Sequence, residues 1–589
     1  MPPNGKRDSE QSVSRRRVLQ TIGAASGAAL AGCLGGGGTE DLGERVPTLT
    51  FQYWSDQGPP TVLFEETISN IRTAADELGI EIETMPMTTA EGLDAVANDS
   101  RGFHIAVNSH GPSPGRLDPN ELLTNYSIDF AGANGNYNPT NYASCEFSEF
   151  AAQQASTGTT EEREQVVGEA MSVFSSDIAF IPTIERPTTA AINTSQIQSI
   201  ETGSAGLTDT HWAALVEAGV SAQSGTDSLI ANLPSEHLTS SFYPTVADGD
   251  SMGLYTSLTH SPLLMYNSNY ELVPVLAEDW EVSEDGTSTT FNLREATFHN
   301  GDPVTPEDIK WTYEFLAEQY HAGNYQWTNL PENLTVEIID NSTVSFNTED
   351  PAPTLLTASL SIYGVLPQAP YVDAGIEDNP TDFEDPMIGA GPYQITAYNN
   401  QENMRLEPHD GHPTYQTDTP ILLQLYDSTD GVVRAFENEE LNVAVALHPE
   451  AGQQLQEQMG DSVQVITGVA HLPFGVMPQM SYAPGMFPEF RQALSHMIDR
   501  QTLNATYAFG ESEVVTHATF NSQEHPWYNE EVLTEIAGER SDTDQARQIL
   551  EDAGWGWDNS GSLYYPQDAS MEAWPEGEEP SSDDFSCLG

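Results

Sequence analysis

The chain has 589 residues, too many for one ordinary hydrophobic core, so two or more lobes are expected. It carries 19 Lys and Arg against 89 Asp and Glu, a formal net charge of −70, which excludes nucleic acid as a partner because binding a phosphate backbone requires a basic surface. The acidic residues are spread between well-patterned apolar segments, which favours a folded protein over a disordered one. Repulsion between so many acids is screened only in concentrated salt, which indicates a salt-loving source.

Residues 1–33 have the pattern of a signal peptide. The pair Arg15 and Arg16 resembles a twin-arginine export signal, and it precedes an apolar run too short to span a bilayer. The residues Leu-Ala-Gly before Cys33 resemble a lipobox, in which the cysteine becomes the lipidated residue. Residues 34–46 follow as a flexible tether. We expect a protein held by lipid on the outer face of the cell membrane. The alternative is an amphipathic first helix with an incidental cysteine.

Two further cysteines, Cys145 and Cys587, lie far apart in the sequence. An exported location permits a disulfide between them, but the sequence does not decide whether it forms. No cysteine spacing is typical of a metal site, and no cofactor is expected.

Residues 47–110 predict the order strand, helix, strand, helix, strand. Side chains alternate over 48–53, an apolar helical stripe covers 62–78 and ends at Gly79, and a short apolar strand covers 103–107. This order is typical of an open α/β sheet.

Later segments carry separate signals. Small and polar residues over 200–226 predict a connector, and alternating residues over 280–293 predict a hairpin whose turn contains Gly286. Thr305 before a proline predicts the start of a helix. Further helices are expected over 487–509 and 541–553, and a disordered acidic tail from residue 576.

Several of these segments together resemble the extracytoplasmic solute-binding proteins of family 5, which serve dipeptide, oligopeptide and nickel ABC transporters. The segments that carry the resemblance are 276–286, 291–294, 298–301, 304–309, 389–393, 491–500 and 545–555. The resemblance covers residues 225–560. It implies an α/β, two-lobed, periplasmic-binding-protein-like fold of type II, with an extra subdomain in lobe I.

The family continues after the segment matched at 545–555 with a strand, a helix and a strand. Segments similar to these stand here at the front, within residues 47–200. We therefore predict a circular permutant in which family-late residues precede family-early ones, joined by the connector. An incomplete gene duplicate is the alternative.

The expected organisation follows from this order. It is a signal peptide at 1–33, a tether at 34–46, lobe II over 47–186, a return to lobe I with the connector over 187–225, lobe I with its subdomain over 226–425, the remainder of lobe II over 426–575 and the acidic tail over 576–589.

The resemblance implies a monomeric lipoprotein that captures a small solute, possibly a peptide, in a cleft between its lobes and delivers it to the permease and ATPase subunits of an ABC importer. Candidate ligand-binding residues are Ser109, His110, Arg116, Thr183, Glu185, Leu233 and Ser235. The aspartate with which peptide binders of the family hold the ligand's amino group has no counterpart here, since its position falls near Gly115. Arg116 suits a carboxylate or phosphate, or is an ordinary loop arginine.

Two other functions stay open. Ser251 lies in a G-x-S-x-G pattern, which is typical of the nucleophile elbow of a serine hydrolase, so a secreted hydrolase is one alternative. That elbow requires an apolar strand before the serine, and here a proline breaks the strand. A helix cap is therefore the favoured interpretation of Ser251. The second is a ligand sensor coupled to a membrane receptor. His409 and His412 lack the helical support of a metal pair, and the acidic stretch 427–440 lacks the ligand order of a calcium loop, so no metal is expected.

Overall fold

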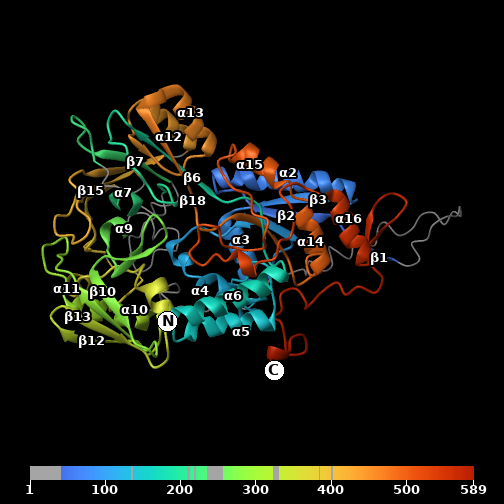
Figure 1. Ribbon diagram of the computed structural model, residues 1–589, viewed down its shortest axis with the longest axis horizontal. Helices are drawn as coiled ribbons and strands as arrows, with labels where there is room; N and C mark the ends of the chain where they lie inside the picture. The colour runs from blue at the N-terminus through green and yellow to red at the C-terminus, as the bar shows by residue number, and fades with distance from the viewer. Residues whose placement is uncertain are drawn as a thin grey trace, which may run out of the picture.

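The computed structural model describes residues 42–133, 137–208, 213–217, 221–234, 256–322, 330–381, 383, 385–399, 402–426 and 428–588. The chain forms two lobes that lie side by side (Figure 1). As the structure bounds them, lobe II comprises the described residues within 42–186 and 470–588, and lobe I comprises the described residues within 187–469. The predictions at Arg15, Arg16, Cys33, Ser235 and Ser251 lie outside the described residues.

The central sheet of lobe II has five strands in the order β3-β2-β4-β19-β5. The predicted βαβαβ order is confirmed by β2 (Leu49–Trp54), α2 (Pro59–Glu77), β3 (Ile82–Met87), α3 (Thr89–Ala97) and β4 (Ile105–Ser109). Strand β2 runs parallel to β3 and β4. Strand β19 (Phe474–Pro478) inserts between β4 and β5 (Ile181–Pro182), antiparallel to both. Two distant parts of the chain therefore complete one sheet.

Both faces of this sheet are covered by helices. On one face, α2 buries its apolar stripe, including Leu63, Phe64 and Ile71, in a core shared with residues of the second half of the chain. The helices contributed by that half are α14 (Pro488–His496), α15 (Arg500–Tyr507) and α16 (Thr543–Asp552). A second core, around Tyr126, Phe174 and Phe520, lies under α4 (Asn120–Asn125), α5 (Cys145–Gln153) and α6 (Thr160–Ser176).

The start of the described chain lies against its late residues. Strand β1 (Leu42–Arg45) pairs antiparallel with β21 (Leu563–Pro566), which also pairs with β20 (Gly556–Trp557). The indole nitrogen of Trp557 donates to the carbonyl of Leu78 at 2.6 Å, beside the end of α2. Residues 42–78 and 556–566 therefore form one packed unit.

Lobe I is built on a seven-stranded mixed sheet in the order β14-β15-β16-β7-β17-β6-β18. Its strands are β6 (Pro187–Asn193), β7 (Leu229–Pro234), β14 (Tyr393–Asn399), β15 (Asn403–Pro408), β16 (Ile421–Tyr426), β17 (Val443–Ala444) and β18 (Val463–Val469). In the predicted connector, the described part includes the short helix α7 (Ala213–Glu217).

A separate four-stranded antiparallel sheet, in the order β10-β11-β13-β12, has its own core. It consists of β10 (Ala277–Val282), β11 (Ser288–Leu293), β12 (Thr335–Asp340) and β13 (Thr343–Asn347). The predicted hairpin is confirmed by β10 and β11, whose turn contains Gly286 at φ 70. The predicted helix is α10 (Pro306–His321), which Thr305 and Asp308 begin with a reciprocal capping box.

Sheet membership moves the lobe boundary predicted after residue 425 to residue 470. Strand β18 pairs along its whole length with β6 in the sheet of lobe I, and β17 lies between β6 and β7. The helices between these strands, α12 (Thr429–Glu437) and α13 (Pro449–Met459), bury Phe436 and Leu455 in a core that they share with this sheet. The apolar pattern of these elements is the same whichever sheet receives them, so the sequence did not fix the boundary.

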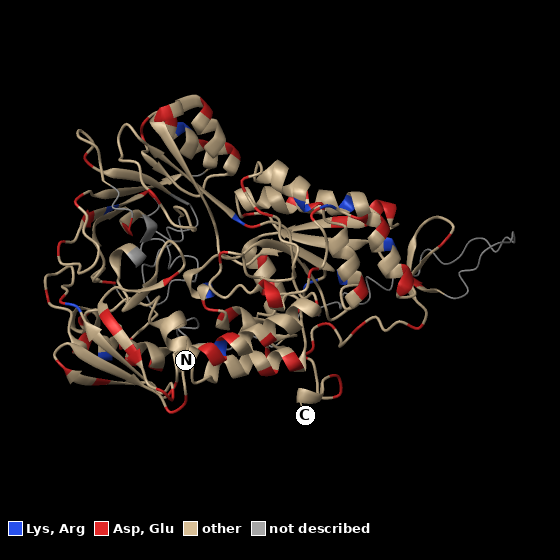
Figure 2. Cartoon of the chain, in the orientation of Figure 1, with Lys and Arg blue, Asp and Glu red and all other residues tan. Residues whose placement is uncertain are grey.

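The acidic tail is ordered, which differs from the prediction. The backbone nitrogen of Gly577 donates to Asp99 at 3.0 Å, and Cys587 forms a disulfide with Cys145 at the start of α5. The rest of the acidic surface extends over helices and loops of both lobes (Figure 2). Within the described parts of the chain, no helix has both the length and the apolar content that a membrane span requires.

Substitution Cys587→Ser is expected to lower the free energy of unfolding by about 2–4 kcal/mol, because the disulfide closes a loop with a sequence separation of 442 residues and restricts the unfolded chain. Urea unfolding in molar KCl measures the change. Cys145→Ser should cause the same loss, and the double variant no further loss. If Cys587→Ser unfolds at the wild-type urea concentration, the bridge does not form.

Candidate functional site

The chain crosses between the lobes through two adjacent segments. The first crossing runs from β5 to β6 over residues 182–187, and the second runs from β18 to β19 over residues 469–474. They lie antiparallel: Ala470 N donates to Arg186 O at 2.9 Å, and Phe474 N donates to Ile184 O at 3.1 Å. Labels β6 and β18 mark this place between the lobes in Figure 1. Two short adjacent crossings are typical of a hinge, about which two lobes rotate as rigid bodies.

A buried carboxyl group lies in the first crossing. Glu185 is 2% exposed, and its Oε1 accepts a hydrogen bond from Gln523 N at 2.9 Å. Its Oε2 has no hydrogen-bond partner among the residues that the structure describes. Burial raises the pKa of Glu185 to about 8, and the nearby carboxylates of Glu524 and Glu513 act in the same direction. The free Oε2 can accept a hydrogen bond from a ligand. A cationic donor would also stabilise the ionised form of Glu185 and so offset the cost of burying its charge.

Arg186 ties the first crossing to the carboxyl end of β4. Its Nη2 donates to the hydroxyl of Ser109 and to His110 O, the latter at 3.2 Å. Its guanidinium group lies over the ring of Phe474, 4.5 Å from the centroid. Ends of parallel strands are the usual place for ligands in α/β sheets, so the position of Ser109 suits a binding site.

The structure brings three of the predicted site residues to the hinge. Ser109 ends β4, and Thr183 and Glu185 lie in the first crossing, where the Thr183 hydroxyl donates to Phe474 O at 3.2 Å. All three are buried. Leu233 lies in β7 of lobe I, paired with Leu425 of β16.

Two other predicted residues are held by partners within lobe II. His110 is hydrogen-bonded through Nε2 to the Tyr126 hydroxyl at 2.9 Å, and its burial lowers its pKa well below the ordinary value. This places a neutral imidazole in the aromatic core. Arg116 Nε donates to Glu121 at 2.7 Å, so its charge is compensated by a neighbouring carboxylate. Neither side chain is directed to the hinge by these contacts.

The sequence did not indicate several residues that also lie at the hinge. In the second crossing, His471 Nε2 donates to Ser113 O at 3.1 Å, and His471 O accepts from Ser522 N at 3.0 Å. The hydroxyl of Ser522 and both polar side-chain atoms of Asn521 are buried, with no hydrogen-bond partner among the described residues. No motif distinguishes this segment, and only its position in the fold reveals it.

A buried ion pair connects the two lobes. Arg163 of α6 donates to both oxygens of Asp118, at 2.7 Å each, and both side chains are at most 2% exposed. Arg163 Nη1 also donates to the hydroxyl of Thr357, at 3.1 Å, and that hydroxyl is hydrogen-bonded to Asp118. Thr357 belongs to lobe I, in the short helix η5 (Leu355–Ser359). Asp118 of lobe II therefore contacts the opposite lobe.

The two histidines considered as a metal pair have other partners. His409 Nε2 donates to Thr297 O at 2.8 Å, and His412 Nε2 is hydrogen-bonded to the hydroxyl of Ser261 at 2.9 Å. Across the ranges covered by the structure, no group of three or more His, Cys, Asp or Glu side chains could hold a metal ion.

Comparison with known proteins identifies the family. The model of the bacterial extracellular solute-binding proteins, family 5 (middle) matches residues 271–581, more than half of the chain. The chain belongs to this family. A dipeptide-binding protein of Escherichia coli is 25% identical over 283 residues, 44% of this chain and 51% of its own length. Heme-binding protein A of Haemophilus influenzae is 23% identical over 340 residues, 53% of this chain and 59% of its own length.

The chain thus spans little more than half the length of these curated family 5 relatives. Among solved structures, the NikZ protein of Campylobacter jejuni, in complex with Ni(L-His), is 20% identical with a TM-score of 0.45, covering 59% of this chain and 66% of its own. Family 5 proteins are solute-binding proteins and not enzymes.

Glu185→Gln is expected to remove a pH dependence of stability. The pKa of this group rises on folding from its ordinary value of 4.5 to about 8. The folded state therefore holds the proton more tightly than the unfolded chain. The stability that Glu185 contributes is complete below pH 4.5 and is lost as the pH rises toward 8.

Urea unfolding at a series of pH values tests this expectation. The difference in unfolding free energy between wild type and Glu185→Gln should change steadily across that window. The exposed Glu511→Gln serves as the control and should follow the wild type. Parallel pH profiles for the wild type and Glu185→Gln would contradict the assignment.

Proposed function

We propose that this protein is the solute-binding component of an ABC importer, which captures a small, peptide-like or other solute between its lobes and delivers it to permease and ATPase subunits. The single observation that carries the proposal is the paired crossing of the lobes, which holds a buried carboxyl group with a free oxygen in a chain of family 5. One relative is named as a dipeptide-binding protein and another as a heme-binding protein, so the class of solute is a question for experiment.

In this proposal Ser109, Thr183 and Glu185 contact the solute. The aspartate that family peptide binders use for the ligand's amino group is absent near Gly115, and Glu185 supplies a carboxyl group from the first crossing instead. A solute with an amino or other hydrogen-bond donor group would satisfy its free oxygen. A cationic group of the solute would favour the ionised form of Glu185, and a hydrogen bond to a charged group is worth about 1.5–3 kcal/mol, so Glu185 is expected to contribute strongly to the affinity for such a solute.

We further propose that the chain is a circular permutant of the family. Support comes from the order of segments in the sequence and from the pairing of β1 with β21, which brings residue 42 beside residue 566. In the usual family order, the chain would pass from β21 into β2. Here the connector over 200–226 would join the two halves.

The anchor completes the proposed organisation. After twin-arginine export directed by Arg15 and Arg16, lipid on Cys33 would hold a monomer on the outer face of the membrane of a halophile. Residues 42–45 of the predicted tether form strand β1, which pairs with β21 of lobe II, so the anchor would hold the protein by lobe II. The four-stranded sheet of β10 to β13 would be the extra subdomain of lobe I.

Thermal unfolding in molar KCl with a panel of dipeptides, nickel–histidine, heme and sugars tests solute capture. One class is expected to raise the unfolding temperature with increasing concentration, because it binds only the folded state. Glu185→Gln should weaken binding of that class at least tenfold, whereas the exposed Glu511→Gln should bind as the wild type. A panel in which no compound raises the unfolding temperature would contradict solute capture.

A rearranged chain tests the permutation. It is opened between Thr208 and Asp209, and Asp568 is joined to Pro47 through a flexible linker of about ten residues, long enough to span the short gap between paired strands. The expected result is a cooperative unfolding transition within a few degrees of a control that lacks residues 1–46 and 569–589 but keeps the present order. Failure of only the rearranged chain to fold would contradict the proposal.

A further inference from the structure

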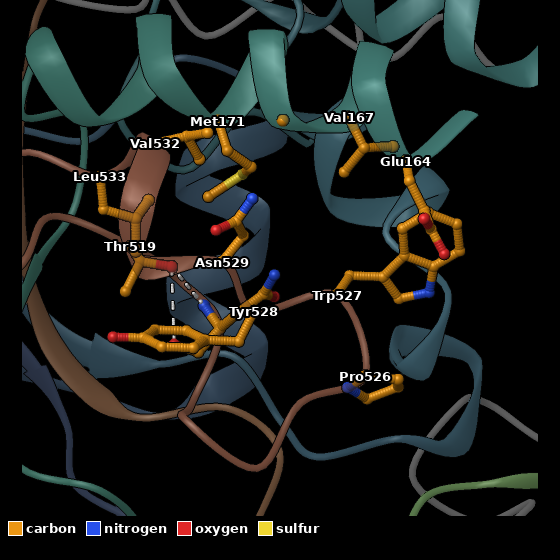
Figure 3. A pocket seen from close by; sticks show the side chains of 12 residues that line it. Glu164, Val167, Met171, Thr519, Pro526, Trp527, Tyr528, Asn529, Val532 and Leu533 are labelled. Atoms are coloured by element: carbon orange, nitrogen blue, oxygen red, sulfur yellow. Dashed lines mark hydrogen bonds between the residues drawn. The ribbon is translucent and has the colours of Figure 1, made fainter. Parts of the chain in front are cut away.

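A cavity lies within lobe II beside the second crossing, and its lining includes none of the residues that we assign to the solute, Ser109, Thr183 and Glu185. Its volume is about 240 Å³, and it lies between α6 and the segment 519–533. Figure 3 shows Val167 and Met171 on the helix facing Trp527 and Leu533 on the opposite segment. All of its lining residues belong to lobe II, so the cavity exists whether the lobes are open or closed.

The cavity contains an unsatisfied amide. Asn521 lines it and is 1% exposed, and neither its Nδ2 nor its Oδ1 has a hydrogen-bond partner among the described residues. Its backbone nitrogen donates to the Thr519 hydroxyl at 3.0 Å, which fixes the turn that carries Asn521. A buried polar group left without a partner costs about 1–3 kcal/mol. A ligand that offers one donor and one acceptor side by side would recover that cost at both atoms.

The aromatic wall of the cavity is held in place by buried charges. The guanidinium group of Arg163 lies 4.8 Å from the ring centroid of Trp527, and Arg163 is itself fixed by two hydrogen bonds to Asp118. His525 Nδ1 accepts from Trp527 N at 3.1 Å, while its Nε2 donates to Arg116 O at 2.9 Å. The backbone and ring of Trp527 are therefore fixed before any ligand binds, which lowers the entropic cost of binding.

The lining also limits the charge of a ligand. Apolar side chains line the cavity from both sides. Three further lining residues are polar, Thr519, Tyr528 and Asn529, and Glu164 is the one charged lining residue. A carboxylate or phosphate would find no cationic partner in the lining and would meet that acid, so an anionic ligand is disfavoured. A flat ring suits the space between an aromatic wall and an apolar helix face.

We propose that this cavity is a second small-molecule site, which binds a neutral aromatic compound through a carboxamide or lactam edge paired with Asn521. The ring would lie against Trp527 and the apolar face of α6, and the amide edge would meet the Asn521 side chain. This site is independent of the proposed solute capture, because it needs neither Glu185 nor closure of the lobes.

Ligand-observed NMR on the full-length chain in molar KCl tests the site with four probes of similar shape. Benzamide offers a donor and an acceptor, methyl benzoate only acceptors, benzoate a negative charge, and ethylbenzene no polar group. Benzamide is expected to bind at least tenfold more tightly than each of the other three. Uracil, which has a lactam edge, should compete with benzamide.

Two variants locate the binding. Asn521→Leu keeps the size of the side chain but removes both polar atoms, so it should fold normally and bind benzamide at least tenfold more weakly. Gly168→Leu should fill the cavity, because a Cβ at this position meets only Val532, at 3.8 Å. Gln165→Leu places the same side chain on the exposed side of α6 and should leave benzamide binding unchanged. Glu185→Gln should also leave it unchanged.

The proposal is overturned if benzamide does not bind the folded wild type, if it binds no better than ethylbenzene, or if Asn521→Leu and Gly168→Leu bind it as well as the wild type. Loss of benzamide binding in Glu185→Gln would place the probe at the hinge instead. Failure of solute capture with retained benzamide binding would leave this site standing.

Discussion

The insertion of β19 between β4 and β5 is the contact on which the rest of the structure depends. Strand β5 leads into the first crossing and β19 follows the second, so one pair of adjacent strands fixes both connections between the lobes. The same strand joins the two parts of lobe II, whose main core mixes residues 46–107 with residues 474–565. The chain therefore leaves lobe II after β5, forms lobe I, and returns to lobe II at β19, so the sheet of lobe II contains strands from both sides of lobe I in the sequence.

Charge is distributed differently inside and outside this framework. The outer acids depend on salt for screening, whereas the buried charges depend on specific partners. Arg163 pairs with Asp118, and Arg500 donates to Pro182 O at 3.1 Å and Ser495 O at 3.0 Å, beside the first crossing. Burial lowers the pKa of Arg500 to about 10. Glu185 lies in the first crossing with one oxygen that has no hydrogen-bond partner among the described residues, which is why we propose it as a solute contact.

Local signals predicted much of the fold. Alternation and helical stripes located the elements over 47–110, and the turn and cap residues Gly286 and Thr305 located the hairpin and the helix after it. These local signals do not show which distant strands pair in one sheet. The lobe boundary was therefore predicted after residue 425, whereas the pairing of β18 with β6 places it at residue 470. Among the site residues, Glu185 followed from the resemblance, whereas His110 proved to be an aromatic core residue. Asn521 was missed because an unpaired amide is visible only once the surrounding atoms are placed.

The central claim is that the lobes close about the paired crossings when a solute binds. Spin labels at the exposed positions Leu93 of lobe II and Ile339 of lobe I, which are 41% and 54% exposed, report the distance between the lobes by pulsed electron resonance. With the solute that raises the unfolding temperature at saturation, the account predicts a distance distribution that becomes narrower and shifts to a single closed population. An unchanged distribution at saturating solute would contradict it.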